Sequence, residues 1–171
     1  MITRRGLLGV GGLGLLGGCG FHPTYGGGET GPAARSLGGI IVDLLPNRAG
    51  QLLRLALQRR FEGPGLGVAK TAELYCTYGI VIEGNGIRQD SAITRDRYVG
   101  NANYTLYSLA TDRRTITSGS ARALDGLDIV NEQYFSADLE GEQIERRLAE
   151  AIADRITTQL ASFYARQNRL A

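Results

Sequence analysis

The chain has 171 residues and a formal net charge of +2, from 19 basic and 17 acidic residues. This length suits one domain with a sizeable core, and loss of a leader containing Arg4 and Arg5 would leave equal numbers of basic and acidic residues. A neutral domain lacks the excess positive charge that attracts nucleic acid, so we expect no nucleic-acid partner.

The first nineteen residues are typical of a bacterial lipoprotein signal. Arg4 and Arg5 precede an apolar run of about ten residues, which is shorter than the roughly 20 needed to cross a bilayer as a helix. A Leu-Gly-Gly-Cys sequence ending at Cys19 then has the order that a lipoprotein signal peptidase recognises. We therefore predict a signal peptide over residues 1–18 and lipid attachment at Cys19, with diacylglycerol on the thiol and an acyl chain on the new amino group.

Two features of this leader leave alternatives open. Its sequence also fits an ordinary cleaved signal that happens to contain a cysteine. The arginine pair fits either general secretion or the twin-arginine export of a folded chain.

A tether and a single domain are expected after the lipid site. Residues 19–36 are rich in Gly, Pro and small polar residues, which predicts a flexible tether. Residues 37–171 are predicted to form one α+β domain. Its first elements are a buried strand within residues 37–45 and an amphipathic helix over about 48–61, which Asn47 can cap.

Three strands and a long helix are predicted for the rest of the chain. The expected elements are a strand at 70–83, a turn region at 84–86, a strand between 95 and 110, a hairpin tip at 112–114, a strand at 115–124, a loop at 125–135 and a helix from Ser136 or Asp138 to about Tyr164. Apolar residues recur at every fourth position of that helix, at Ile144, Leu148, Ile152, Ile156 and Leu160. The fold class is therefore α+β, with two helices packed on a four-stranded mixed sheet in the order β-α-β-β-β-α.

Few residues of the predicted domain suit catalysis. The only histidine, His22, lies in the tether, so the core offers no imidazole as a general base. Cys76 shares the parity of the apolar residues in its strand, which favours a small buried side chain over a reactive thiol. We predict no catalytic residue, no metal site and no cofactor other than the lipid on Cys19. An enzyme that relies on carboxylates alone is the alternative.

The charged side chains suggest surface contacts. Glu142 and Arg146 have the i,i+4 spacing of an ion pair on the outer face of the last helix. Arg88, Arg95 and Arg97 flank the start of the second long strand, and such a cluster can bind phosphate groups. Solvated arginines paired with nearby aspartates are the alternative.

The sequence around the lipid site also resembles a known family. Residues 18–23 read Gly-Cys-Gly-Phe-His-Pro, similar to the start of the lipopolysaccharide-assembly lipoproteins of the LptE family, and the predicted order of elements is similar too. The leader and tether resemble the alphaproteobacterial form. This resemblance implies an outer-membrane lipoprotein with two helices on a four-stranded sheet. Such proteins plug the β-barrel translocon LptD, support its assembly and bind lipopolysaccharide on its way to the outer leaflet.

The resemblance also implies an address and a binding site. Gly20 follows the lipidated cysteine where an aspartate would retain many lipoproteins in the inner membrane, so we expect the outer membrane. Arg88, Arg95 and Arg97 become candidate lipopolysaccharide contacts, although residues 135–138, at the start of the last helix, lack a basic residue. The alternative function is that of an auxiliary lipoprotein in an ABC-type lipid transport system.

Overall fold

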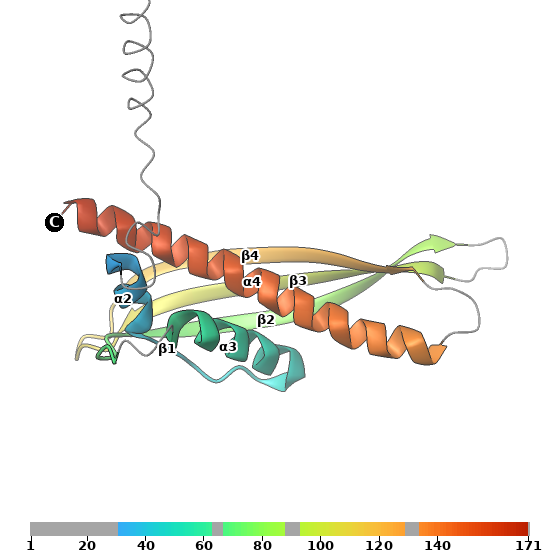
Figure 1. Ribbon diagram of the computed structural model, residues 1–171, viewed down its shortest axis with the longest axis horizontal. Helices are drawn as coiled ribbons and strands as arrows, with labels where there is room; N and C mark the ends of the chain where they lie inside the picture. Colours follow the sequence, from blue (N-terminus) through green and yellow to red (C-terminus); the bar gives the residue numbers. More distant parts are fainter. Residues whose placement is uncertain (1–30, 63–66, 88–92, 129–133, 171) are drawn as a thin grey trace, which may run out of the picture.

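The sequence folds into a long sheet with helices on one face, as the computed structural model in Figure 1 shows. The structure describes residues 31–62, 67–87, 93–128 and 134–170. The elements are α2 (Pro32–Gly38), β1 (Ile40–Val42), α3 (Asn47–Glu62), β2 (Ala72–Ile87), β3 (Ile93–Ser108), β4 (Thr115–Asp128) and α4 (Tyr134–Leu170). The predicted α+β class is confirmed, with α2 as an addition, so the order of elements is α-β-α-β-β-β-α.

The sheet is mixed and its strands lie in sequence order, β1-β2-β3-β4. The short β1 runs parallel to β2, whereas β2, β3 and β4 pair antiparallel through two hairpins. At the centre of the sheet, Cys76 of β2 lies opposite Tyr104 of β3, which lies opposite Gly119 of β4. The hairpin predicted with its tip at 112–114 is therefore present, and β4 forms one edge of the sheet.

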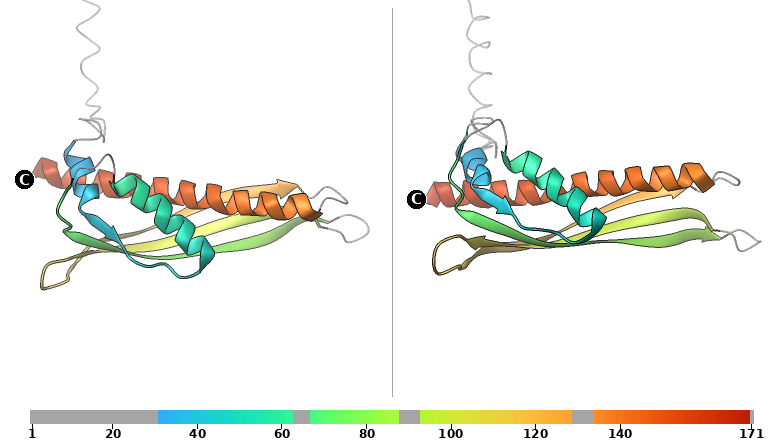
Figure 2. Two further views of the ribbon diagram at one scale, coloured as in Figure 1. Left: turned by 60° about the horizontal axis from the view of Figure 1, so that its bottom comes forward. Right: turned by 90° about the horizontal axis from the view of Figure 1, so that it is seen from below.

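Helices α3 and α4 cover one face of the sheet, and none of the described helices lies on the other face (Figure 2). On α4, all five residues of the predicted four-residue repeat are at most 1% exposed. They pack over inward-facing strand residues such as Leu74, Cys76 and Leu106. Burial raises the pKa of the Cys76 thiol to about 12, with a smaller contribution from Asp43. The prediction of a buried Cys76 is confirmed.

Several boundaries differ from the predicted ones. β1 has three residues, and Leu37, placed at the start of the predicted strand, belongs to α2. Residues 32–36 of the predicted tether are also helical. The glycine-rich turn expected at 84–86 is instead part of β2, because Gly84 and Asn85 pair with β3 and pairing satisfies their backbone groups. At the chain's other end, α4 starts at Tyr134 and extends to Leu170.

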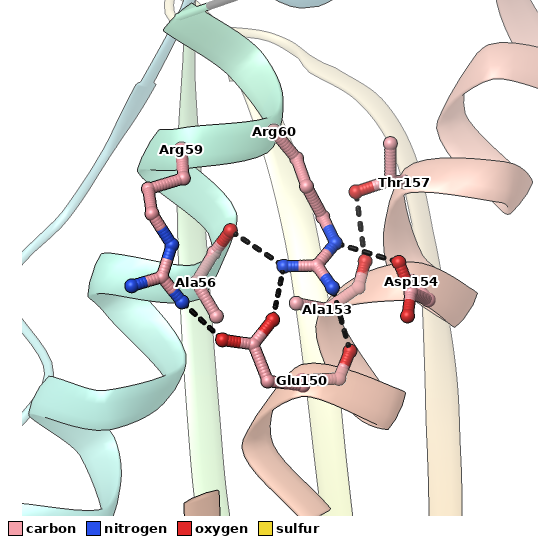
Figure 3. Close-up of polar contacts among 7 residues, drawn as sticks. All are labelled: Ala56, Arg59, Arg60, Glu150, Ala153, Asp154 and Thr157. Carbon is pink, nitrogen blue, oxygen red and sulfur yellow. Dashed lines mark hydrogen bonds and ion pairs between the residues drawn. The ribbon is translucent and has the colours of Figure 1, made fainter. Parts of the chain in front are cut away.

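Ion pairs hold α3 against α4 (Figure 3). The Arg60 guanidinium donates to Asp154 at 2.7 Å, lies 2.7 Å from the Glu150 carboxylate and also donates to the Ala56 carbonyl at 3.0 Å. Arg59 donates to the same Glu150. The hydrogen bond with Asp154 is the main cause of the raised pKa of Arg60. These contacts join the two helices above the buried apolar cluster that they share.

A further ion pair corrects the prediction for Glu142. This carboxylate accepts a hydrogen bond from Arg48 of α3 at 3.0 Å, and the contact lowers the pKa of Glu142. Arg146, the predicted partner, adds only a weaker electrostatic effect. Glu142 therefore links α4 to α3. The spacing of residues along α4 could not predict this contact, because Arg48 is far away in the sequence.

Candidate functional site

The face of the sheet that points away from the helices leaves many strand side chains exposed (Figure 2). Alternating side chains of β2, β3 and β4 point to this side. We call it the helix-free face, and its main members are Tyr75, Thr77, Gly79, Val81, Asn101, Asn103, Ser118, Ser120, Arg122 and Leu124. In the strand register, Thr77, Asn103 and Ser120 form one row across the three strands. Hydroxyl and amide groups thus dominate the middle of this face.

A shallow hollow lies on this face above Gly79. It has a volume of about 270 Å³ and is lined by Thr77, Asn101 and Asn103, among other residues. A Cβ atom at Gly79 would meet no atom within 4 Å, so packing of the domain does not require glycine there. The hollow offers amide and hydroxyl groups to a partner surface without a charge of its own.

Beside the polar rows lies an apolar row. Val81, Val99 and Leu124 occupy neighbouring register positions, and Val81 and Leu124 are more than half exposed. Ile82, the next residue of β2, is exposed to a similar extent but points to the opposite side of the sheet. Val99, which lies between them in the register, is only 2% exposed, so Val81 and Leu124 supply the exposed apolar surface of this row. The helix-free face therefore combines polar and apolar contacts suited to association with another surface.

The structure only partly tests the predicted site residues. Cys19 and Arg88 lie outside the described residues. Arg95 and Arg97 lie two positions apart on β3, opposite Asn85 and Glu83 of β2. The Arg97 guanidinium is exposed, and its Nε atom lies 3.8 Å from a Glu83 carboxylate oxygen. Arg97 is thus available at the surface but partly neutralised by an acid on the neighbouring strand.

Sequence analysis missed a groove between β4 and the C-terminal half of α4. It has a volume of about 410 Å³ and is open to solvent. Four consecutive β4 residues, Thr117, Ser118, Gly119 and Ser120, line one side, and Thr158, Gln159, Ser162, Phe163 and Arg166 of α4 line the other. Tyr104 forms part of the lining. The groove joins segments about 40 residues apart in the chain, so no local sequence pattern indicates it.

A hydrogen-bonded chain crosses this groove. The Tyr104 hydroxyl donates to the Gln159 side-chain oxygen at 2.7 Å, and the Gln159 amide donates to the Ser120 carbonyl at 3.1 Å. Burial raises the pKa of the Tyr104 hydroxyl. A Cβ atom at position 119 would lie 2.6 Å from the tyrosine oxygen, so Gly119 makes room for the ring.

Two kinds of feature are absent from the described residues. Within residues 31–62, 67–87, 93–128 and 134–170, no group of three or more His, Cys, Asp or Glu side chains could hold a metal ion. None of the helices described there combines the length and apolar character needed to span a membrane.

Comparison with known proteins identifies the family. The family model described as "LptE: Lipopolysaccharide-assembly" matches residues 37–160, which is most of the chain. The chain belongs to the LptE family. This match confirms the predicted family resemblance. LptE proteins act as lipoproteins in lipopolysaccharide assembly at the outer membrane. A comparison with curated proteins gives no match.

Solved structures show the same fold. A candidate lipoprotein from Caulobacter crescentus CB15 matches 78% of this chain and 96% of its own, at 20% identity and a TM-score of 0.60. Rare lipoprotein B from Shewanella oneidensis matches 75% and 98%, at 9% identity and a TM-score of 0.57. A minor lipoprotein from Acinetobacter baumannii matches 72% and 90%, at 14% identity and a TM-score of 0.53. At these identities the likeness concerns the fold.

Proposed function

We propose that this LptE-family protein is a non-catalytic outer-membrane lipoprotein that associates with and plugs the lipopolysaccharide translocon barrel LptD. It assists assembly of the barrel and delivery of lipopolysaccharide to the outer leaflet. The family match over residues 37–160 carries this proposal. Acyl chains on Cys19 anchor the protein, because two or more chains hold a protein on a membrane far longer than one.

The helix-free face suits contact with the inside of a barrel. The interior of an outer-membrane barrel is polar, whereas its outer surface is apolar. Thr77, Asn101, Asn103 and Ser120 present uncharged donors and acceptors that can pair with such a lining. The Val81–Leu124 row adds apolar contact area beside them. A domain of this kind can fill part of a lumen without carrying out any reaction.

The ion pairs between α3 and α4 make the domain a stiff wedge. Arg60 contacts two acidic residues of α4, and Arg48 contacts a third, so both helices keep their positions over the sheet. A stiff domain loses little conformational freedom on binding, and this favours association.

The arginines Arg88, Arg95 and Arg97 contact lipopolysaccharide phosphates in this account. Guanidinium groups form charge-assisted hydrogen bonds with phosphate oxygens. Arg97 would exchange its long contact with Glu83 for a phosphate. Replacing Arg95 and Arg97 together by Glu should weaken lipopolysaccharide binding while barrel association persists. Equal lipopolysaccharide affinity of the double variant would contradict this site.

Photocrosslinking in intact cells tests the barrel association. A photoreactive amino acid at Thr77 should crosslink to a β-barrel protein of translocon size, identified by mass spectrometry of the product. Depletion of the protein should also raise envelope permeability. Absence of a barrel from the products at both Thr77 and the neighbouring Asn101 would contradict the proposal.

The lipid anchor has a separate test. Cys19→Ala should leave the chain without acyl groups, which the mass of the purified protein reports, and should reduce its share in the outer-membrane fraction. An unchanged mass relative to the acylated chain would contradict lipidation at Cys19.

A further inference from the structure

The strand pairing shows which backbone groups of β4 point away from β3, toward the open edge of the sheet. The Ser108 amide of β3 donates to the Arg114 carbonyl across the hairpin at 2.9 Å. Backbone groups of successive strand residues point to alternate sides, so even-numbered residues of β3 face β4 and odd-numbered ones face β2. Ser118 and Ser120 lie opposite the odd-numbered Thr105 and Asn103. Their own N–H and C=O groups therefore point away from β3, to the open edge.

A second observation agrees with this direction. The Ser120 carbonyl accepts a hydrogen bond from the side-chain amide of Gln159, which lies on α4 beyond the edge. The Gln159 amide occupies the position that a peptide N–H of an added strand would take. The edge of β4 is thus able to accept a donor from the groove.

The groove has the form that an extended peptide requires. An edge strand forms one wall and one face of a helix forms the other, an arrangement in which peptides bind by adding a strand to the sheet. The small residues Ser118, Gly119 and Ser120 allow a backbone to approach closely, and Phe163 supplies an apolar contact for a side chain. The strand β4 has 14 residues and lies at the edge of the sheet, and an edge strand is a template for strand pairing.

Charge favours an acidic segment as the occupant. Arg166 is the charged residue of the lining, it is exposed, and it forms no ion pair with another residue that the structure describes. A second copy of this chain fits poorly, because β4 pairing with itself would bring the same cationic linings together without an acid to offset them.

We infer that the groove between β4 and α4 binds an extended segment of the barrel partner, which pairs with Ser118 and Ser120 of the β4 edge and places a carboxylate near Arg166. This inference rests on the proposed function, which supplies the partner. The added strand replaces the Gln159 amide at the Ser120 carbonyl, and Gln159 keeps its contact with Tyr104.

Hydrogen exchange tests the inference on the complex purified from membranes. The amides of Ser118 and Ser120 should exchange at least about tenfold more slowly in the complex than in the full chain alone, because a strand bond shields them. If the complex forms and these amides exchange at unchanged rates, the groove inference fails while the proposed function stands. If no barrel partner copurifies, both fail. If these amides exchange more slowly in the isolated chain as its concentration rises, the edge pairs with a second copy of the chain and the inference is overturned.

Matched variants separate edge pairing from side-chain contact. Ser120→Pro removes the edge-facing N–H without breaking a bond to β3, whereas Ser120→Ala keeps it. The proline variant should lower affinity for the partner about tenfold, and the alanine variant less than about twofold. Arg166→Glu should also weaken binding, with Arg155→Glu, outside the groove, as its control. Equal losses in the two Ser120 variants would overturn the inference, and the exchange experiment decides it if the proline variant does not fold.

Discussion

The two faces of the sheet use the same three strands for different purposes. On the covered face, Gly100, Ala102, Ala121 and Ala123 are buried small residues that let α4 lie close to β3 and β4. The residues between them, Asn101 and Arg122, point to the helix-free face, and both are exposed. The comparison shows that packing against the helices constrains the identity of every second residue in these strands. The alternate residues are free to contact a partner.

The largest contrast should appear when one side chain from each face is shortened. Ile152 of α4 is fully buried over the covered face, and Ile152→Ala should lower the free energy of unfolding by about 2–5 kcal/mol through lost burial and a cavity. Thr77→Ala on the helix-free face should change it by no more than about 0.5 kcal/mol. Urea unfolding measures both. Similar losses in the two variants would contradict the division between the faces.

Two glycines allow the same comparison at the level of one methyl group. Gly119→Ala places a Cβ atom 2.6 Å from the Tyr104 oxygen and 2.8 Å from its ring, which should cost about 1–3 kcal/mol of stability through overpacking. Gly79→Ala meets no atom within 4 Å and should be tolerated. Thermal unfolding of both variants tests this difference. A stable Gly119→Ala protein would show that the Tyr104 ring moves aside at little cost.

The sequence predicted the covered face well because helix packing leaves a regular trace. The apolar side chains of α4 recur at every fourth residue, and all five predicted positions are buried. Cys76 was likewise predicted from its parity in β2. The extra helix α2 was missed because Pro32 and the glycines around it are typical of a tether, whereas its packing against α3 and α4 depends on tertiary contacts.

The groove and the helix-free face were less accessible to prediction. Gly84 and Gly86 indicated a turn, yet β3 pairs with this part of β2 and continues the strand. The weak apolar pattern of β4 does not fix its register, so the row that joins Thr77, Asn103 and Ser120 could not be derived. The Arg88, Arg95 and Arg97 site stays a prediction.

The helix contacts above the covered face provide a finer comparison. Arg60 is only 20% exposed and contacts Glu150 and Asp154, whereas Arg59 is 64% exposed. Arg60→Ala should reduce stability by about 1–2 kcal/mol, and Arg59→Ala by no more than about 0.5 kcal/mol. Chemical denaturation provides the measurement. A larger effect at Arg59 would mean that surface charge, not the half-buried contact, holds α3 on α4.

The smallest expected effect concerns the acid side of the pH profile. Burial alone would raise the pKa of Asp125, but hydrogen bonds from Arg147 and the Gly126 amide, both at 2.8 Å, lower it overall. Its stabilising effect is therefore present above the ordinary Asp pKa and is lost as the pH falls through the lowered value. The stability difference between the native protein and Asp125→Asn should shrink from pH 6 to pH 3 in urea titrations. A constant difference would contradict this assignment.

The central claim is that this LptE-family wedge works by association with an outer-membrane barrel. Native mass spectrometry of the intact complex, extracted gently from membranes, tests it most directly. We predict one acylated copy of this chain bound to one β-barrel protein. Release of the chain alone, or together with subunits of an inner-membrane ABC transporter, would contradict the account.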